Sequence, residues 1–133
     1  GVPIHSFQYF GPKLRIETRQ YMRAADVFIN TSKRDELSSA MLEAMAEGCA
    51  VIATATSINE TLIDDGQNGL LIPVGDSSAL ATACALLEKD EYLRNRLSKA
   101  AKETIARDFS PQAELTGYEE LYKEVLRGKS SVA

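Results

Sequence analysis

Short apolar runs alternate with amphipathic stretches along most of the chain. Four runs of apolar and β-branched residues have the length of strands and end at glycine, proline or polar residues. They span residues 4–10, 27–29, 51–55 and 70–74. The run at 27–29 is apolar throughout, which is typical of a strand in the middle of a parallel sheet with both faces covered.

The stretches between these runs have the periodicity and the end signals of helices. Helices are expected over residues 15–25, from 39 to a stop at Gly48, and over 57–63, 77–87, 91–107 and from 110 onward. Asp76 and Asp90 are suitable N-caps, and Ser57 with Glu60 has the spacing of a capping box. In the stretch 91–107, apolar residues recur on one helical face. These are Leu93, Leu97, Ala101 and Ile105.

Strands that alternate with helices predict an α/β fold with a three-layer, doubly wound parallel sheet, that is, a Rossmann-like fold. The length of 133 residues suits one domain with its own core. We expect residues 1–127 to form this domain and residues 128–133 to be a disordered polar tail.

The polar loop after residues 27–29 is the main candidate for a binding site. Open parallel sheets bind ligands where loops leave the carboxyl ends of strands. This loop also enters a helix, whose free N–H groups and dipole suit an anion such as phosphate. Asp35 and Glu43 flank the turn. Carboxylates beside an anion site are suited to accept hydrogen bonds from the hydroxyl groups of a sugar or a ribose.

Composition and charge exclude several other classes of function. The net charge of −4, without a basic stripe, argues against a surface dedicated to nucleic acid. No apolar run approaches the length of a membrane span and no signal peptide opens the chain, so a cytoplasmic location is expected. Cys49 and Cys84 have no partner at metal-ligand spacing. They are therefore interpreted as buried thiols in a reducing compartment.

Four motifs of the chain carry a resemblance to a known family. They are Ala25-Asp26-Val27-Phe28-Ile29, Leu42-Glu43-Ala44-Met45-Ala46, Val51-Ile52-Ala53-Thr54 and Asp65-Gly66-Gln67-Asn68-Gly69. Taken together, they resemble the C-terminal, donor-binding domain of GT-B-type retaining glycosyltransferases of the group 1 or family 4 kind. The resemblance implies that the chain matches the latter part of that domain. Two central strands of the family's domain, and the whole acceptor-binding domain, would then come from sequence outside this chain.

The resemblance also implies roles for particular residues. The family motif is two glutamates separated by seven residues, with Gly-Phe-Gly after the first. Here Asp35 stands at the first acid position, Glu36-Leu37-Ser38 replaces Gly-Phe-Gly, and Glu43 stands at the second acid position. Asp35 would be the catalytic carboxylate, facing the donor sugar and stabilising the positive charge of the transition state. Glu43 would contact the ribose hydroxyls.

The remaining donor-binding residues follow from the same resemblance. Glu36, Leu37, Ser38 and Ser39 would present the loop to the diphosphate, chiefly through backbone N–H groups. Lys13 lies where the family's main chain contacts the nucleotide base. Simpler roles are compatible with some of these positions: an Asx turn for Asp35, an N-cap for the serine pair and a dipole interaction for Glu43.

The expected function is therefore the donor-binding portion of a retaining glycosyltransferase, with a nucleotide-diphosphate sugar as substrate and no metal or other cofactor. The alternative is a non-catalytic relative that serves as a binding or assembly module. The expected partners are the nucleotide-sugar and an N-terminal acceptor domain or partner chain, with peripheral membrane association of the full enzyme. The isolated chain is expected to be inactive.

Overall fold

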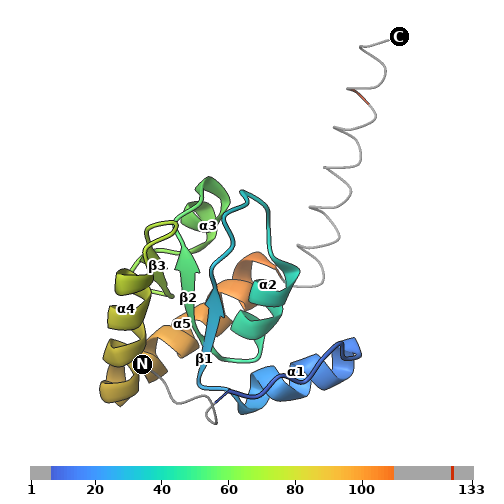
Figure 1. The fold of residues 1–133 in the computed structure, drawn as a ribbon. Helices are drawn as coiled ribbons and strands as arrows, with labels where there is room; N and C mark the ends of the chain where they lie inside the picture. Colours follow the sequence, from blue (N-terminus) through green and yellow to red (C-terminus); the bar gives the residue numbers. More distant parts are fainter. Residues whose placement is uncertain (1–6, 110–126, 128–133) are drawn as a thin grey trace.

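Three parallel strands form the centre of the molecule. In the computed structural model, which describes residues 7–109 and residue 127, the strands are β1 (Val27–Asn30), β2 (Ala50–Thr54) and β3 (Leu70–Ile72). Their order in the sheet is β1-β2-β3, with Phe28 opposite Val51 and Ile52 opposite Leu70. The strands lie between helices on both sides (Figure 1).

Helices alternate with the strands, as the periodicity predicts. In the described part of the chain they are α1 (Arg15–Ala24), α2 (Ser39–Ala46), α3 (Ser57–Leu62), α4 (Ser77–Lys89) and α5 (Glu91–Asp108). Asp76 and Asp90 are the N-caps of α4 and α5, as predicted. Gly48 has a φ of 86°, the left-handed conformation that ends α2.

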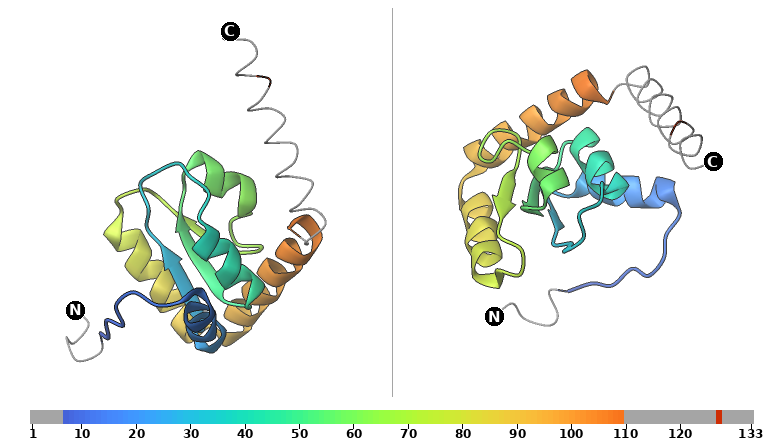
Figure 2. Two further views of the ribbon diagram at one scale, coloured as in Figure 1. Left: turned by 90° about the vertical axis from the view of Figure 1, so that its right-hand side faces the viewer. Right: turned by 90° about the horizontal axis from the view of Figure 1, so that it is seen from above.

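The core consists of two main clusters, one on each face of β2. Val51 and Ala53 pack with buried residues of α2, the end of α3 and the second half of α5. Ala50 and Ile52 pack with α4 and the first half of α5. The two views of Figure 2 show α2 and α4 on opposite sides of the sheet. The predicted doubly wound α/β fold is therefore confirmed.

The predicted strand at residues 4–10 is wrong for the part that the structure describes. Residues 7–10 have no regular secondary structure and form an extended arm with α1 at its end (Figure 2). Tyr9 is 92% exposed, and Phe10 contacts Tyr21 with 4.4 Å between ring centroids. A strand is stable only where a neighbour satisfies its backbone groups, and no described strand pairs with this arm.

Two local predictions also need correction. The N-cap of α3 is Thr56, whose side chain accepts a hydrogen bond from the Asn59 N–H, so the expected box of Ser57 and Glu60 does not form. The sequence offers Ile16, Tyr21 and Met22 as inward residues of α1, but of these three Met22 alone is buried, and Ile16 is 67% exposed. Tyr21 is 44% exposed, and its ring contacts Phe10.

The predictions for the cysteines and for the strand at residues 70–74 hold in part, and two others concern residues that the structure does not describe. Cys49 is buried and Cys84 only partly buried, and both thiols are free. The strand expected over 70–74 ends at Ile72, before Pro73. The helix expected from residue 110 and the tail at 128–133 lie outside the described residues.

A buried asparagine ties the loop between α3 and β3 to α5. Asn68 is 6% exposed, and its Nδ2 donates to the Leu62 carbonyl and to Thr104 Oγ1 at 3.2 and 3.1 Å. Its Oδ1 accepts the Asp64 N–H at 2.8 Å. One side chain thus satisfies three polar groups from two segments, which fixes where β3 begins.

We predict that Asn68→Ala lowers the free energy of unfolding by about 2–4 kcal/mol, because it leaves buried partners without hydrogen bonds. Denaturant unfolding followed by circular dichroism measures this loss. Gln67→Ala removes the neighbouring exposed amide and is the matched control, with an expected change below about 0.5 kcal/mol. Equal effects of the two substitutions would contradict the structural role of Asn68.

Candidate functional site

The loop between β1 and α2 is attached to the carboxyl ends of two strands. Asn30, the last residue of β1, accepts the Ser32 N–H at 3.1 Å through Oδ1. Thr54, the last residue of β2, donates its hydroxyl to the Ser32 carbonyl at 2.5 Å. The loop therefore starts from a fixed point at the edge of the sheet where open α/β folds bind ligands.

The other end of the loop caps α2. The Ser38 hydroxyl accepts the Met41 N–H at 3.2 Å, and α2 begins at Ser39. Glu36 and Leu37 are exposed, and Leu37 has 49% of its surface accessible. The predicted N-cap role of this serine pair is thus observed for Ser38, while Glu36, Leu37 and Ser39 lie on an accessible surface.

Asp35 lies against α3. Its Oδ1 accepts the Ile58 N–H at 2.7 Å, at the first turn of that helix. This hydrogen bond bridges the loop to an element 23 residues away in sequence. Asp35 therefore supplements the Thr56 cap, and it is not among the residues that line the hollow around Glu43.

Glu43 lies in an open hollow of about 620 Å³ between α1, α2 and the C-terminal end of α5. This hollow, which we call the α1–α2 hollow, brings together Lys13, Ser39 and Glu43, three of the residues that the sequence places at the donor site. Leu42, Ile105 and Phe109 give it an apolar wall. A smaller hollow of about 290 Å³, lined in part by Thr31, Lys33 and Thr54, lies at the carboxyl ends of the strands.

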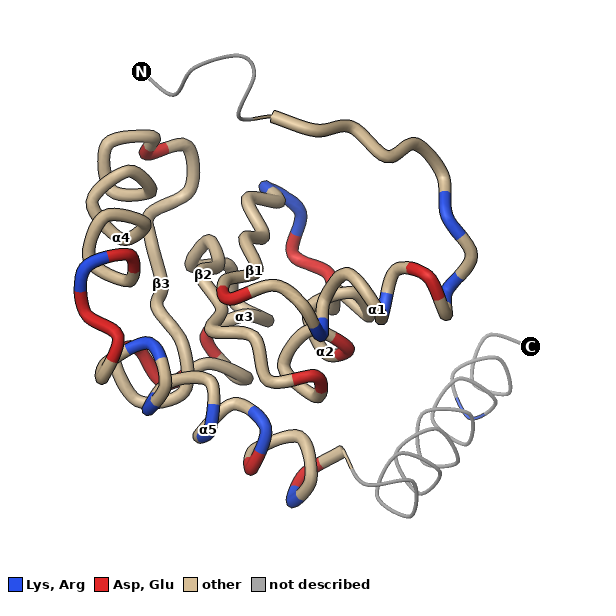
Figure 3. Tube along the Cα trace, turned by 90° about the horizontal axis from the view of Figure 1, so that it is seen from below, with Lys and Arg blue, Asp and Glu red and all other residues tan. Residues whose placement is uncertain are grey.

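Three arginines of α1 pair with one glutamate in α2 and with a second at its C-cap. We call these five residues the charge ladder: Arg15, Arg19, Arg23, Glu43 and Glu47. Figure 3 shows basic positions of α1 beside acidic positions of α2. Arg15 Nε lies 2.7 Å from Glu43 Oε1, with 77% of the arginine side chain and 19% of the glutamate side chain exposed. No motif in the sequence singles out Arg15, although Arg15, Arg19 and Arg23 recur every four residues and therefore share one helical face.

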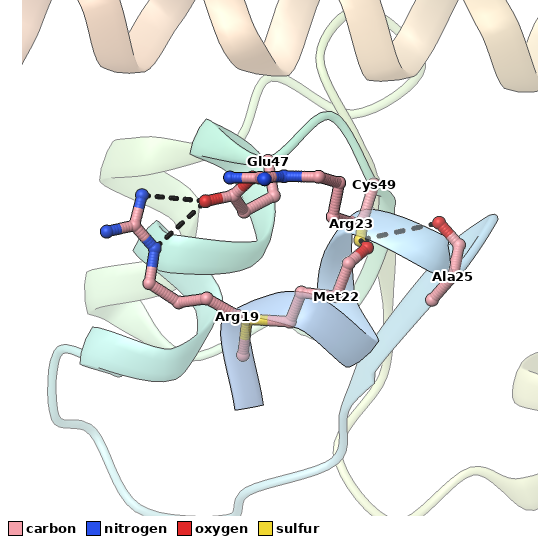
Figure 4. Close-up of polar contacts among 6 residues, drawn as sticks. All are labelled: Arg19, Met22, Arg23, Ala25, Glu47 and Cys49. Atoms are coloured by element: carbon pink, nitrogen blue, oxygen red, sulfur yellow. Dashed lines mark hydrogen bonds and ion pairs between the residues drawn. The ribbon is translucent and has the colours of Figure 1, made fainter. Parts of the chain in front are cut away.

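In the charge ladder, the carboxylate of Glu47 is more buried than that of Glu43. The Glu47 carboxylate is held between Arg19 and Arg23, with its side chain 7% exposed (Figure 4). Arg19 Nη2 lies 2.7 Å from Oε1, and Arg23 Nε lies 2.9 Å from Oε2. The hydrogen bonds from Arg23 and Arg19 lower the pKa of the Glu47 carboxyl below its usual value, against the opposing effect of burial.

A buried thiol lies beside this group. Cys49 Sγ is 2.9 Å from the Met22 carbonyl and 3.7 Å from the Ala25 carbonyl (Figure 4). Burial raises the pKa of the Cys49 thiol, and the negative charges of Glu47 and Asp26 raise it further. Cys49 is therefore an inert thiol that packs against the end of α1.

Residues 7–109 and 127 contain neither a metal-ligand cluster nor a membrane-spanning helix. No cluster of three or more histidine, cysteine, aspartate or glutamate side chains there has the arrangement of a metal site. None of the helices in that part of the chain combines the length and the apolar character needed to cross a membrane.

Comparison with protein families gives a clear match. The model of a family described as "Glycosyl transferases group 1" matches residues 4–104, which is most of the chain. The chain belongs to the group 1 glycosyltransferases. The resemblance stated from the sequence motifs is thereby confirmed.

Individual bacterial enzymes are similar to most of this chain. The chain is 33% identical to the lipopolysaccharide core biosynthesis glycosyltransferase LpsE of Rhizobium meliloti, over 79% of this chain and 31% of that protein. It is 30% identical to N-acetyl-alpha-D-glucosaminyl L-malate synthase of Bacillus anthracis, over 81% of this chain and 28% of that protein. The chain thus spans about a third of the length of these relatives.

Solved structures agree with the fold. HepE of Anabaena, solved in complex with UDP and glucose, superposes with a TM-score of 0.73 at 25% identity, over 82% of this chain and 30% of that one. The C-terminal domain of a group 1 glycosyltransferase from Francisella tularensis gives a TM-score of 0.68 at 26% identity, over 79% of this chain and 53% of that one. The superposed part of this chain thus covers about half of that solved domain.

Acid should weaken the Glu47 contacts. Because the pKa of Glu47 is lower in the folded state than in the unfolded state, its contribution to stability is present above the usual glutamate pKa of about 4.3. It is lost as the pH falls through the folded value. Glu47→Gln should cost about 1 kcal/mol at neutral pH, since both arginines are partly exposed.

Unfolding measured from about pH 7 to about pH 3 tests this, with the difference between wild type and Glu47→Gln expected to shrink toward acid pH. Glu103→Gln, on an exposed face of α5, is the control. A difference that stays constant over that range would mean that the charge of Glu47 does not stabilise the fold.

Proposed function

We propose that this chain is the donor-binding part of a glycosyltransferase that moves a sugar from a nucleotide-sugar to an acceptor with retention of configuration. Family membership supports the transferase class. HepE was solved with UDP and with UDP-glucose, which supports a nucleotide-sugar as the donor. The activity belongs to a larger assembly, because the chain covers about a third of the length of its relatives.

The observation that carries the proposal is the position of Glu43. It is a largely buried carboxylate in a hollow whose other charged lining residues, among those that the structure describes, are the cations Lys13, Arg15 and Arg19. A site of this kind suits a ligand with hydroxyl groups for the carboxylate and negative charge for the cations. A nucleoside diphosphate has both, in its ribose and its phosphates.

The other predicted site residues would also contact the donor. Ser38, Ser39, Leu37 and Glu36 present the loop and the first N–H groups of α2 to the diphosphate. Lys13 lines the α1–α2 hollow, where its main chain would contact the base. Apolar contact with the base would come from Ile105 and Phe109.

The catalytic role of Asp35 rests on a different arrangement. The hydrogen bond from Ile58 fixes the carboxylate through Oδ1 and leaves a second oxygen for chemistry. In a retaining transfer this oxygen would stabilise positive charge at the anomeric carbon. We place the reaction at the carboxyl ends of the strands, between Asp35 and residues of the acceptor-binding domain.

No metal and no other cofactor is needed in this proposal, because arginine, lysine and backbone N–H groups can offset the phosphate charge. A cytoplasmic location and peripheral membrane association of the full enzyme stay predictions. The acceptor-binding domain or partner chain is the expected partner.

Glu43→Ala should weaken binding of nucleoside diphosphates at least tenfold, which is about 1.4 kcal/mol, because it removes the acceptor for the ribose hydroxyls. Calorimetric titration with UDP, GDP and ADP measures the change. The free energy of unfolding should change by less than about 1 kcal/mol, since the substitution removes only one ion pair with an exposed arginine.

Glu103→Ala makes the same substitution on an exposed face of α5 and should leave nucleotide binding unchanged. Equal affinities for the wild type and Glu43→Ala, in a protein that binds a nucleotide, would exclude Glu43 from the donor site and remove the main support for the proposal.

The chain by itself should bind donor weakly, transfer no sugar and self-associate. Within the described residues β1 is an edge strand, and Ile29 is 44% exposed there. An apolar strand edge of this kind recruits another chain. Sedimentation at several concentrations tests self-association, and a donor-hydrolysis assay tests the absence of turnover. A monomer at every concentration that also hydrolyses nucleotide-sugar would refute them.

A further inference from the structure

We propose that Arg15 binds the diphosphate of the donor, after leaving the ion pair that holds it on Glu43 in the free protein. In this exchange the ribose hydroxyls replace the guanidinium at the Glu43 carboxylate, and the guanidinium moves to a phosphate. The inference rests on the proposed donor-binding function and adds to it a residue that was not expected from the sequence.

The different exposure of the two side chains allows the ion pair between Arg15 and Glu43 to exchange for contacts with a ligand. Glu43 is mostly covered, at 19% exposure, whereas Arg15 reaches it from solvent with 77% of its side chain exposed. A largely buried carboxylate needs a partner at all times, because an unpaired charge at such a position is costly. Arg15 supplies that partner in the free protein, and hydroxyl groups supply it in the complex.

The place of Arg15 in α1 gives a second reason. Arg15 is the first residue of α1, where the helix dipole disfavours a positive charge. The stability of α1 therefore does not explain an arginine there. Arg19 and Arg23, one and two turns farther along the same helix, are in contrast fixed by Glu47.

Charge in the α1–α2 hollow supports an anionic ligand. Its described lining contains three cations, Lys13, Arg15 and Arg19, and the single carboxylate of Glu43. Glu47 neutralises one of the two arginines that share it, so Arg19 and Arg23 together with Glu47 retain one positive charge. Once Glu43 is occupied by hydroxyl groups, Arg15 has no remaining carboxylate in this lining.

The exchange is also favourable in energy. An ion pair with a solvent-exposed arginine contributes little to stability, so it is released at small cost. Arginine and phosphate likewise form short, charge-assisted and often bidentate hydrogen bonds, and a diphosphate carries more negative charge than the single carboxylate that is released. The exchange therefore converts a weak contact within the protein into a stronger contact with the ligand.

The test compares each nucleoside diphosphate with its own nucleoside. The wild-type chain, Arg15→Ala and the control Arg96→Ala are titrated with UDP, GDP and ADP and with uridine, guanosine and adenosine. Arg96 is an exposed arginine of α5 that does not line the α1–α2 hollow. For the preferred base, Arg15→Ala should weaken diphosphate binding about tenfold and leave nucleoside binding equal or tighter. Arg96→Ala should change neither.

The possible outcomes distinguish a failure of the Arg15 exchange from a failure of the donor site at Glu43. If Arg15→Ala leaves diphosphate binding unchanged, or weakens nucleoside and diphosphate equally, the exchange is wrong while the donor site at Glu43 stands. If the wild type binds no nucleotide, or Glu43→Ala binds as well as the wild type, the donor site itself is wrong, and the exchange falls with it. Arg15→Lys separates charge from geometry, since a lysine should recover only part of the diphosphate affinity.

Discussion

The burial of β2 on both faces is the constraint on which the rest of the structure depends. Its residues are at most 2% exposed, and they alternate between the two main core clusters. A shift of one residue in register would exchange the two sets of side chains, so the register is fixed by packing. Because the strand is fixed, its last residue, Thr54, can hold the loop at Ser32 and thereby position the start of the candidate site.

The sequence predicts most of this frame, because the frame depends on local signals. Helix caps such as Asp76 and Asp90 act within one turn, and the left-handed residue Gly48 acts at one position. The apolar repeat of α5 is also local. This repeat does not reveal that Leu97 packs on one face of the sheet and Ala101 on the other. That arrangement depends on the path of the whole helix.

Apart from the N-cap of α3, the predictions that the structure contradicts have a common physical origin: they concern contacts between distant segments. Residues 7–10 have the composition of a strand, but a strand exists only if another strand pairs with it, and pairing is not a property of the segment. The N-cap of α3 is Thr56 and not the expected Ser57, because either hydroxyl could begin a helix in this stretch. The contact between Asp35 and Ile58 joins the loop after β1 to α3, the helix that follows β2. Periodicity carries no information about such a contact.

The contacts between α1 and α2 show why one part of the ladder is structural and the other is suited to binding. The arginines of α1 recur at four-residue spacing, as do Glu43 in α2 and Glu47 at its C-cap, but only packing brings the two sets of charges together. Glu47 is nearly covered and shared by two arginines, so removing either arginine leaves the carboxylate paired. Glu43 has one described cationic partner, and that partner is exposed. The buried part can therefore keep α1 on α2 while the exposed part opens, so that ligand exchange at Glu43 does not require the helices to separate.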